Sequence, residues 1–353
     1  MIKAVKYTLI AVLMAVLMTV SGVLTLRRSP LIEVGKDTPV DCVIALRGNP
    51  SHGMALSTGF HYELLRKAQA LLGHPFEIRL CGREESILDS LKEGKITLAV
   101  LPAGDSALRC SNGLICSRIF PDSAVWVVAE NGIISSKALT FTVLGLEGRG
   151  DWNSTIERFT PSYEPFSRIK SRRHSWPCAS PYDELIKTTA KGIGWDWRML
   201  AAVVWQESRF RIEARSHRGA EGLMQVMPYT ARYLQGDDVL LDPERNLEAG
   251  ASYLRRLMRL FSGDAASEDE LMRITLAAYN AGEGRIRECL TLARAKGLAG
   301  NKWDDIKAII PDLRDGDVMI GDSVVIGTFQ GYETIAYVAR TDSLYQAFKI
   351  IAP

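Results

Sequence analysis

The sequence has few of the residues that build metal sites, and its charges nearly balance. Six Cys and five His occur among 353 residues, without the paired short spacing of a zinc site and without an HExxH pattern. We therefore expect no bound metal and no other cofactor. The formal net charge is +2, whereas a dedicated nucleic-acid binder usually has a strong basic excess on one face. We therefore expect no nucleic-acid partner.

Internal repeats and low-complexity tracts are also absent. Charged residues make up 24% and hydrophobic residues 47% of the chain, which is an ordinary globular composition and excludes a wholly disordered chain. At roughly 100–200 residues per domain, the length predicts two folded units with appendages.

One long hydrophobic run lies near the start, from Tyr7 to Leu26, with lysines before it and two arginines after it. Roughly 20 apolar residues can span a bilayer, and a basic start followed by an apolar stretch also marks an export signal. No Cys directly follows the run, so a lipoprotein anchor is not supported. We expect residues 1–28 to be a signal peptide or a membrane anchor, which places the protein in the periplasm or at a membrane of the cell envelope. In an exported chain, Cys110 and Cys116 are close enough in sequence to bridge, and small buried thiols are the alternative.

Residues 40–158 alternate short apolar runs with amphipathic segments. We expect strands at 42–46, 76–81 and 96–101, helices at 59–72 and 85–93, and a further apolar run at 125–128. Strands that alternate with helices predict right-handed crossovers onto a parallel sheet. This stretch is therefore expected to be a small α/β domain.

The composition changes to Pro, Ser and basic residues at 159–180, which predicts a solvated linker. Residues 181–353 then form a second domain in which nearly every segment has helical periodicity. Helices are expected at 182–191, 197–207, 229–234, 247–261, 268–280 and 333–350. The fold class is therefore an α+β multidomain chain, a small α/β lobe followed by a mainly α domain.

Glu207 ends a strongly apolar segment and is the first candidate for chemistry. Val203 and Val204 lie one helical turn before it, so its carboxyl group is expected beside apolar surface without an obvious cationic partner. Such surroundings raise the pKa of a carboxylic acid, and an acid that stays protonated near neutral pH can protonate the leaving oxygen of a glycosidic bond. A lone Glu at a helix end is more often a surface residue, so its context decides.

Three motifs follow Glu207 in order: Gly219-Ala-Glu-Gly222-Leu-Met-Gln225, Ala278-Tyr-Asn280-Ala-Gly282 and Glu333-Thr-Ile-Ala-Tyr337. The two glycines of the first motif permit a tight turn, so Met224 and Gln225 can line a sugar groove, with core packing as the alternative for Met224. In the second motif, Tyr279 and Asn280 place a ring and an amide where Gly282 can end a helix. We expect Gly250, between the motifs, to contact another helix.

With these motifs in this order, the sequence from about Tyr182 onward resembles the transglycosylase (SLT) domain of the soluble and membrane-bound lytic transglycosylases, which has a lysozyme-like fold. The resemblance implies an enzyme that cuts peptidoglycan glycan strands. It implies that Glu207 protonates the bond between N-acetylmuramic acid and N-acetylglucosamine and then acts as a base. The muramic C6 hydroxyl attacks C1 and leaves a 1,6-anhydro end, so no second carboxylate is needed. The implied groove residues are Ser216, Met224, Gln225, Tyr279, Asn280, Glu333 and Tyr337, with an orienting role as the alternative for Glu333.

The first domain resembles the first lobe of a periplasmic solute-binding fold. The resemblance rests on Gly59-Phe-His-Tyr-Glu-Leu-Leu, on Leu91-Lys-Glu-Gly94 and on the apolar strand at Ile96. Together the two domains are similar to the membrane-bound lytic murein transglycosylases of type F. Residues 131–180 are too few for a complete second lobe, so the solute-binding-like domain is expected to be truncated. A muropeptide or an envelope protein is its candidate ligand.

Two other functions compete with this interpretation. Goose-type muramidases share the fold and hydrolyse with water, but they carry an Asp shortly after the Met-Gln pair, where this chain has Met227-Pro228. An inverting route also needs a second carboxylate about 6.5–9.5 Å from the first. The other alternative is a non-catalytic protein that binds peptidoglycan or senses the envelope, although such a protein need not keep Glu207.

Overall fold

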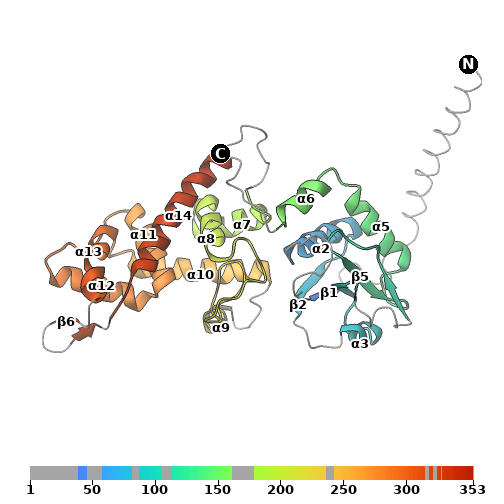
Figure 1. Cartoon of the computed structure of the whole chain (residues 1–353), viewed down its shortest axis with the longest axis horizontal. Coiled ribbons are helices and arrows are strands. Elements are labelled where there is room, and N and C mark those ends of the chain that lie inside the picture. The colour runs from blue at the N-terminus through green and yellow to red at the C-terminus, as the bar shows by residue number, and fades with distance from the viewer. Residues whose placement is uncertain are drawn as a thin grey trace, which may run out of the picture. The chain divides into compact units, whose positions relative to one another are not determined.

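The computed structural model describes most of the chain, and this chain separates into two compact units, Met1–Thr160 and Pro161–Pro353 (Figure 1). The expected signal or anchor segment, most of the expected linker, and Cys110 of the expected cysteine pair lie outside the described residues. Among the residues that the structure describes, no helix has the length and apolar character needed to cross a membrane. The described residues are 39–45, 58–81, 87–104, 113–160, 179–235, 242–314, 318–320, 324–326 and 328–352.

A mixed five-stranded sheet forms the centre of the first unit, with strand order β2-β1-β3-β5-β4. β1 is parallel to both β2 and β3, whereas β5 runs antiparallel to β3 and to β4. The expectation of a parallel sheet is therefore wrong for β5, which is antiparallel to both of its neighbours. Only residues 117–123 connect β4 to β5, and a parallel pair needs a crossover of about a dozen residues or more. The strands are β1 (Val40–Ala45), β2 (Phe76–Cys81), β3 (Leu98–Pro102), β4 (Leu114–Cys116) and β5 (Ala124–Ala129).

Helices cover both faces of this sheet, which explains why its central strands are apolar throughout. α2 and β2 have the expected bounds, and the left-handed Gly73, with φ of 71°, ends α2. One face packs against Ile87 and Leu91 of α3. The sequence analysis did not anticipate α5 or α6. The helices are α2 (Gly59–Leu72), α3 (Ile87–Lys92), α5 (Ser136–Glu147) and α6 (Trp152–Arg158).

A buried polar chain joins α2 to β5 inside the first unit. The Trp126 indole Nε1 donates to His61 Nδ1 at 3.0 Å, and His61 Nε2 lies 3.1 Å from Asp122 Oδ2. Since Nδ1 accepts from the indole, the ring proton is assigned to Nε2, which donates to the carboxylate. The network therefore satisfies three buried polar side chains at once.

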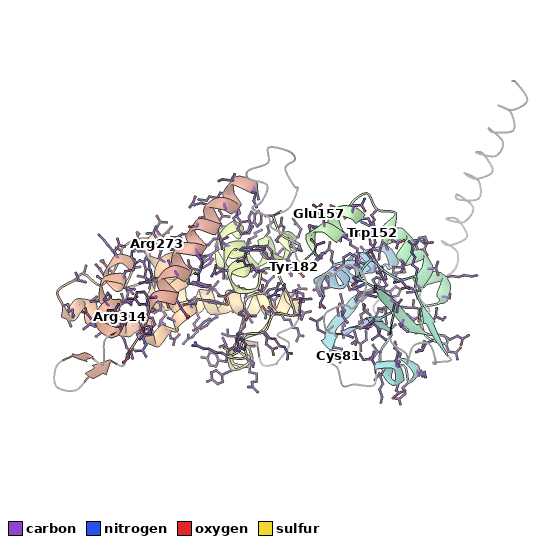
Figure 2. All side chains as sticks on the ribbon, in the orientation of Figure 1. Cys81, Trp152, Glu157, Tyr182, Arg273 and Arg314 are labelled. Atoms are coloured by element: carbon purple, nitrogen blue, oxygen red, sulfur yellow. The ribbon has the colours of Figure 1, made fainter. Side chains whose placement is uncertain are left out.

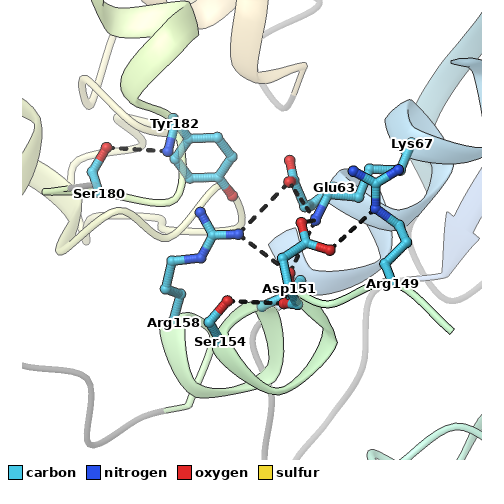
Figure 3. A network of polar contacts seen from close by, with 9 residues as sticks. Glu63, Lys67, Arg149, Asp151, Ser154, Arg158, Ser180 and Tyr182 are labelled. Atoms are coloured by element: carbon cyan, nitrogen blue, oxygen red, sulfur yellow. Dashed lines mark hydrogen bonds and ion pairs between the residues drawn. The ribbon is translucent and has the colours of Figure 1, made fainter. Parts of the chain in front are cut away.

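Charged side chains also tie α2 to α6 (Figure 3). Lys67 Nζ lies 2.9 Å from Asp151 Oδ2 and 3.2 Å from Glu63 Oε1, and Arg158 Nη2 reaches the same Glu63 oxygen at 3.8 Å. Asp151 also accepts from Arg149. Because both helices belong to the first unit, this network holds its last described helix in place.

The second unit is mainly helical, and each helix expected from the sequence is present with small shifts in its bounds. α10 begins four residues earlier than expected, because Asp242 caps it by accepting from the Arg245 backbone N–H at 2.8 Å and Pro243 occupies its first turn. The sequence analysis missed α12, α13 and the β6–β7 hairpin. The elements are α7 (Asp183–Ile193), α8 (Trp197–Ser208), α9 (Pro228–Gln235), α10 (Pro243–Phe261), α11 (Glu268–Ala281), α12 (Glu283–Ala295), α13 (Trp303–Arg314), β6 (Val318–Ile320), β7 (Val324–Ile326) and α14 (Tyr332–Ile351).

α8 lies at the centre of the second unit. Every residue from Met199 to Trp205 is buried, and the helix packs against α7 and α14. A helix that is apolar on all sides needs neighbours on all sides. At its start, the Asp196 side chain accepts from the Arg198 backbone N–H at 2.9 Å. The buried helix therefore has a fixed start and delivers its last turn, which contains Glu207, to a defined place.

The turn Gly222–Gln225 packs on α10 through Met224 and Gly250. A β-carbon added at Gly250 would lie 2.5 Å from the Met224 sulfur and 2.7 Å from its β-carbon. Contacts this short require the neighbour to move, and Met224 is fully buried. Gly250 is thus a contact residue of α10, as expected from the sequence, but its partner is the turn at Met224 rather than another helix.

Gly250→Ala should destabilise the protein by about 1–3 kcal/mol, the usual cost of overpacking a core. Gly192→Ala on α7 is the matched control. A β-carbon at Gly192 would meet nothing within 4 Å, and alanine in a helix is favoured over glycine by roughly 0.5–1 kcal/mol. Urea unfolding measures both variants, and a Gly250→Ala protein as stable as the parent would contradict the packing argument.

Candidate active site

Glu207 lies in the last turn of α8, where the chain reverses sharply. Arg209 and Phe210 both have left-handed backbone conformations, with φ of 55° and 60°, which side chains other than glycine seldom adopt. Phe210 is buried, with its ring centroid 5.3 Å from that of Trp205 and 6.2 Å from that of Phe348 on α14. These contacts hold the strained reversal and so fix the end of the helix.

A tyrosine from the far end of the second unit contacts the Glu207 carboxyl group. The Tyr337 hydroxyl, on α14, donates to Glu207 Oε1 at 2.6 Å, and the tyrosine itself is buried. Burial raises the pKa of Glu207 to about 7, and the hydrogen bond from Tyr337 acts in the opposite direction. Near neutral pH a substantial fraction of Glu207 therefore carries a proton that it can donate.

Burial of the Glu207 carboxyl group is the main cause of its raised pKa, and the hydrogen bond from Tyr337 lowers that pKa. Glu213 is a second, partly buried acid in the loop that follows α8, and burial raises its pKa as well. Of the two, Glu207 is the acid whose carboxyl group accepts from the tyrosine on α14. Glu207 is therefore the candidate proton donor at this site.

Tyr279, at the end of α11, lies beside the same carboxyl group. Burial raises the pKa of the Tyr279 hydroxyl well above its usual value, and the charge of Glu207 raises it further. The hydroxyl donates to the backbone carbonyl of Met224 at 2.8 Å. On the other side, its ring centroid lies 5.6 Å from that of Tyr253 on α10. The structure thus brings three of the predicted residues, Glu207, Tyr279 and Tyr337, together.

Buried hydrogen bonds hold the turn that contains Met224 and Gln225. The fully buried Asn246 side chain accepts from the Met224 backbone N–H and donates to the Glu221 carbonyl, both at 2.8 Å. Gln225 Nε2 donates to the carbonyls of Ala214 and Gly222 at 3.0 and 3.1 Å. The Met224 side chain is buried in the core, and its backbone carbonyl accepts from Tyr279. The Gln225 amide nitrogen holds the loop through its two hydrogen bonds.

The remaining predicted residues lie at the surface of the second unit. Ser216 is exposed, and its hydroxyl accepts from the Ala220 backbone N–H at 2.9 Å within a turn. Asn280 is exposed at the end of α11 and accepts from the Thr334 hydroxyl of α14 at 2.9 Å. Glu333 is exposed in the first turn of α14, where the helix dipole favours an acid. Asn280 thus connects two helices of the site, and Ser216 and Glu333 are surface residues of the same unit.

Sequence reasoning assigned no role to Tyr253, Asn246 or Thr334. Tyr253 and Asn246 lie on α10, between the first and second motifs, and their contacts with Tyr279 and with the turn depend on tertiary packing. Thr334 lies inside the Glu333–Tyr337 motif, which is the signal that could have found it. Among the described residues, no group of three or more His, Cys, Asp or Glu side chains could hold a metal ion.

An ion pair holds α14 against α11 close to the site. Arg273 of α11 is labelled in Figure 2, and its Nε lies 3.4 Å from Asp342 Oδ2 on α14. Arg273 also pairs with Glu270 one turn earlier at 2.9 Å. This pair and the Thr334–Asn280 hydrogen bond set the position from which Tyr337 reaches Glu207.

Tyr337→Phe should raise the pKa of Glu207 above its value of about 7, because it removes the hydrogen bond that favours the ionised carboxylate. A ¹³C NMR titration of the Glu207 carboxyl carbon measures the change. Tyr345→Phe is the matched control, since the Tyr345 hydroxyl donates to Asp196 at 3.0 Å instead. An unchanged or lowered pKa in Tyr337→Phe would show that the hydrogen bond does not favour the anion.

Comparison with known proteins places this geometry in a family context. Residues 184–300 match the family described as "Transglycosylase SLT domain". A membrane-bound lytic murein transglycosylase F from Desulfosudis oleivorans is 34% identical over 279 residues, covering 75% of this chain and 59% of the relative. One from Alcanivorax borkumensis is 33% identical over 192 residues, covering 54% and 40%. The chain spans about half the length of these relatives.

Among solved structures, the 70 kDa soluble lytic transglycosylase from Escherichia coli is 27% identical, with a TM-score of 0.36, over 48% of this chain and 24% of that one. Glu207, Met224 and Tyr279 all fall inside the matched residues 184–300, whereas Tyr337 lies beyond them. The chain therefore contains a transglycosylase SLT domain and is related to the membrane-bound lytic murein transglycosylases F.

Proposed function

We propose that the protein is a peptidoglycan lytic transglycosylase that cuts the β-1,4 bond between N-acetylmuramic acid and N-acetylglucosamine. The observation that carries the proposal is Glu207, whose pKa burial raises to about 7 and whose carboxyl group accepts from Tyr337 within a unit that contains an SLT domain. An acid that is part protonated near neutral pH suits protonation of a leaving glycosidic oxygen.

The chemistry that we propose needs one carboxyl group in two successive roles. Glu207 donates its proton to the glycosidic oxygen as the bond to C1 breaks, and the resulting carboxylate then accepts the proton of the muramic C6 hydroxyl. That hydroxyl oxygen attacks C1 and forms the 1,6-anhydro ring, so the proton returns to Glu207 and no water is consumed. One carboxyl group, held by the Tyr337 hydroxyl, suffices for both proton transfers of this route, whereas inverting hydrolysis needs a second acid.

The neighbouring tyrosines have supporting roles in this proposal. The Tyr337 hydroxyl donates to Oε1, so it stabilises the carboxylate that remains after proton transfer and holds the group in one orientation. Tyr279 fixes the Met224 carbonyl at the edge of the site. Ser216, Gln225, Asn280 and Glu333 stay candidate contacts to the glycan strand. The membrane-bound name of the relatives supports a location in the cell envelope.

The parent protein should release fragments from purified sacculi that end in 1,6-anhydro-muramic acid and weigh one water less than hydrolytic fragments. Glu207→Gln should lower this release by at least about 10²-fold, because the amide keeps the shape and cannot deliver a proton. Turnover of the parent should fall as the pH rises through about 7, since the acid then loses its proton. Mass spectrometry of the soluble products measures both release and end group.

Glu213→Gln is the matched control, because it removes the partly buried acid of the loop that follows α8 and should leave release near the parent level. Muropeptide release by Glu207→Gln at the parent level would contradict the assignment of Glu207 as the acid. Reducing ends as the main product would favour the muramidase alternative instead.

We further propose that the second unit folds and acts without the first, and that its boundary lies at Ala179 rather than at Pro181. The Asp183 carboxylate, at the start of α7, accepts from the Ala179 and Ser180 backbone N–H groups, both at 2.7 Å, and from the Ser180 hydroxyl at 2.6 Å. These three bonds are buried, so a cut at Pro181 would leave a buried carboxylate without its donors.

A fragment of residues 179–353 should therefore be soluble and should release muropeptides from sacculi. A fragment of residues 181–353 should be less stable by roughly 1–3 kcal/mol, the cost of a buried polar group that loses its partners. Thermal unfolding compares the two fragments, with the intact protein as the reference for activity. An insoluble or inactive 179–353 fragment beside an active intact protein would show that the two units fold as one.

A further inference from the structure

Two exposed tyrosines stand on one face of α9, in the second unit. Tyr229 is 75% exposed and Tyr233 is 70% exposed. Residues four apart lie above one another on a helix, about 5–6 Å apart, so the two rings form one surface. That spacing is comparable with the length of a single pyranose ring. Two adjacent rings with this exposure contribute little to the core, and exposed apolar patches often mark binding sites.

Two further tyrosines, Tyr253 on α10 and Tyr279 on α11, lie near Glu207, and α10 packs against α9. Tyr279 stacks on Tyr253, with ring centroids 5.6 Å apart. The Arg256 side chain, one turn along α10 from Tyr253, pairs with Glu283, and Nη2 to Oε1 measures 2.9 Å. The pKa of Arg256 is raised mainly by that bond, and the charges of Tyr253 and Tyr233 add to the rise.

α9 also connects directly to the turn of the site. It begins at Pro228, immediately after the loop that contains Met224 and Gln225, and it packs against α10 (Figure 1). Tyr279 and Tyr253 are partly buried, whereas Tyr233 and Tyr229 on the neighbouring helix are exposed. Partly buried rings near the acid, with exposed rings on the helix that follows the turn of the site, suit a linear polymer that is cut at that acid.

The chemistry of these tyrosines fits a sugar strand. A tyrosine ring packs on the apolar C–H face of a pyranose, while its hydroxyl can exchange hydrogen bonds with sugar hydroxyls. The surroundings are polar, with the exposed Arg232 on the same short helix and with Arg256, on the α10 helix against which α9 packs, paired with Glu283. Such a setting suits a hydroxylated polymer better than lipid tails.

We propose that the Tyr229–Tyr233 face of α9 is an outer glycan subsite that holds sugar units of the same peptidoglycan strand whose scissile bond lies at Glu207. This inference rests on the proposed function, because it takes the strand cut at Glu207 as the ligand. It assigns α9 to strand binding and leaves the proton transfer at Glu207 unchanged.

Binding is measured with the intact protein carrying Glu207→Gln, so that the strands stay uncut. Long and short glycan strands fractionated from the same sacculi are the ligands. Adding Tyr229→Ala and Tyr233→Ala together should weaken binding of long strands about tenfold, the change that corresponds to about 1.4 kcal/mol. Short strands that fill only the sites around Glu207 should bind as before. Both side chains are exposed, so thermal unfolding should be unchanged.

Three control variants distinguish ring stacking on sugars from non-specific hydrophobic binding. Phe at both positions keeps the rings and should retain binding within about twofold, whereas Leu at both positions keeps the apolar character without a flat face and should match Ala. Ile350→Ala removes another side chain, 66% exposed. It stands 13 residues after Tyr337 on α14, about 20 Å away at 1.5 Å per residue, and should bind as the parent does.

Equal binding of long strands by the Ala variant and its parent would overturn this subsite. Full retention by the Leu variant would overturn it as well, because a lipid surface or a second copy of the chain would then fit better. If the unsubstituted protein releases muropeptides while the α9 variants behave alike, the subsite fails and the proposed function stands. If the unsubstituted protein neither binds nor cuts the strands, both fail.

Discussion

The hydrogen bond between Tyr337 and Glu207 depends on most of the architecture of the second unit. The two residues are 130 positions apart in sequence, so their contact requires α8 and α14 to pack together. α8 is buried on all sides, and α14 is held against α11 by the Arg273–Asp342 pair and by Thr334 bonding to Asn280. A small error in any of these contacts would move a phenol that must stay within hydrogen-bond distance of a carboxyl oxygen.

Placing an acid at the end of a buried helix is energetically unfavourable. Burial penalises the ionised form, and the C-terminal end of a helix dipole repels an anion. The reversal after Ser208 adds two non-glycine residues with positive φ, at Arg209 and Phe210. Strain of this kind survives when surrounding packing enforces it, here through Trp205 and Phe348. The packing of α8 against α14 therefore offsets the cost of keeping the Glu207 carboxyl group buried and partly protonated.

The sequence predicted best those features that depend on local signals. The bounds of α2 and β2 were correct because Gly73 ends the helix and because Phe76–Cys81 alternates as a strand does. Pairing direction has no local signal, so the antiparallel pairing of β5 with β3 and with β4 was not foreseen. α12 follows Gly282 without a break long enough to mark a new helix, and α13 contains Pro311, so neither stood out.

In the site, the apolar surroundings of Glu207 could be predicted because Val203 and Val204 are neighbours in the same helix. The roles of Tyr253 and Asn246 could not be predicted, since they arise only when α10 packs against the turn. The same limit applies to Met224, whose type suits both a groove and a core. Its burial against Gly250 is decided by a residue on another helix.

The distance in sequence between Glu207 and Tyr337 also determines when the site can assemble during synthesis of the chain. A ribosome that adds about 5–20 residues per second needs on the order of ten seconds to proceed from α8 to α14. Throughout that interval the nascent chain carries the acid without its phenol partner, and Phe210 lacks Phe348, which holds the reversal after α8. The geometry around the acid is thus completed only after nearly all of the described chain has been made, so an unfinished chain presents Glu207 in an unassembled site.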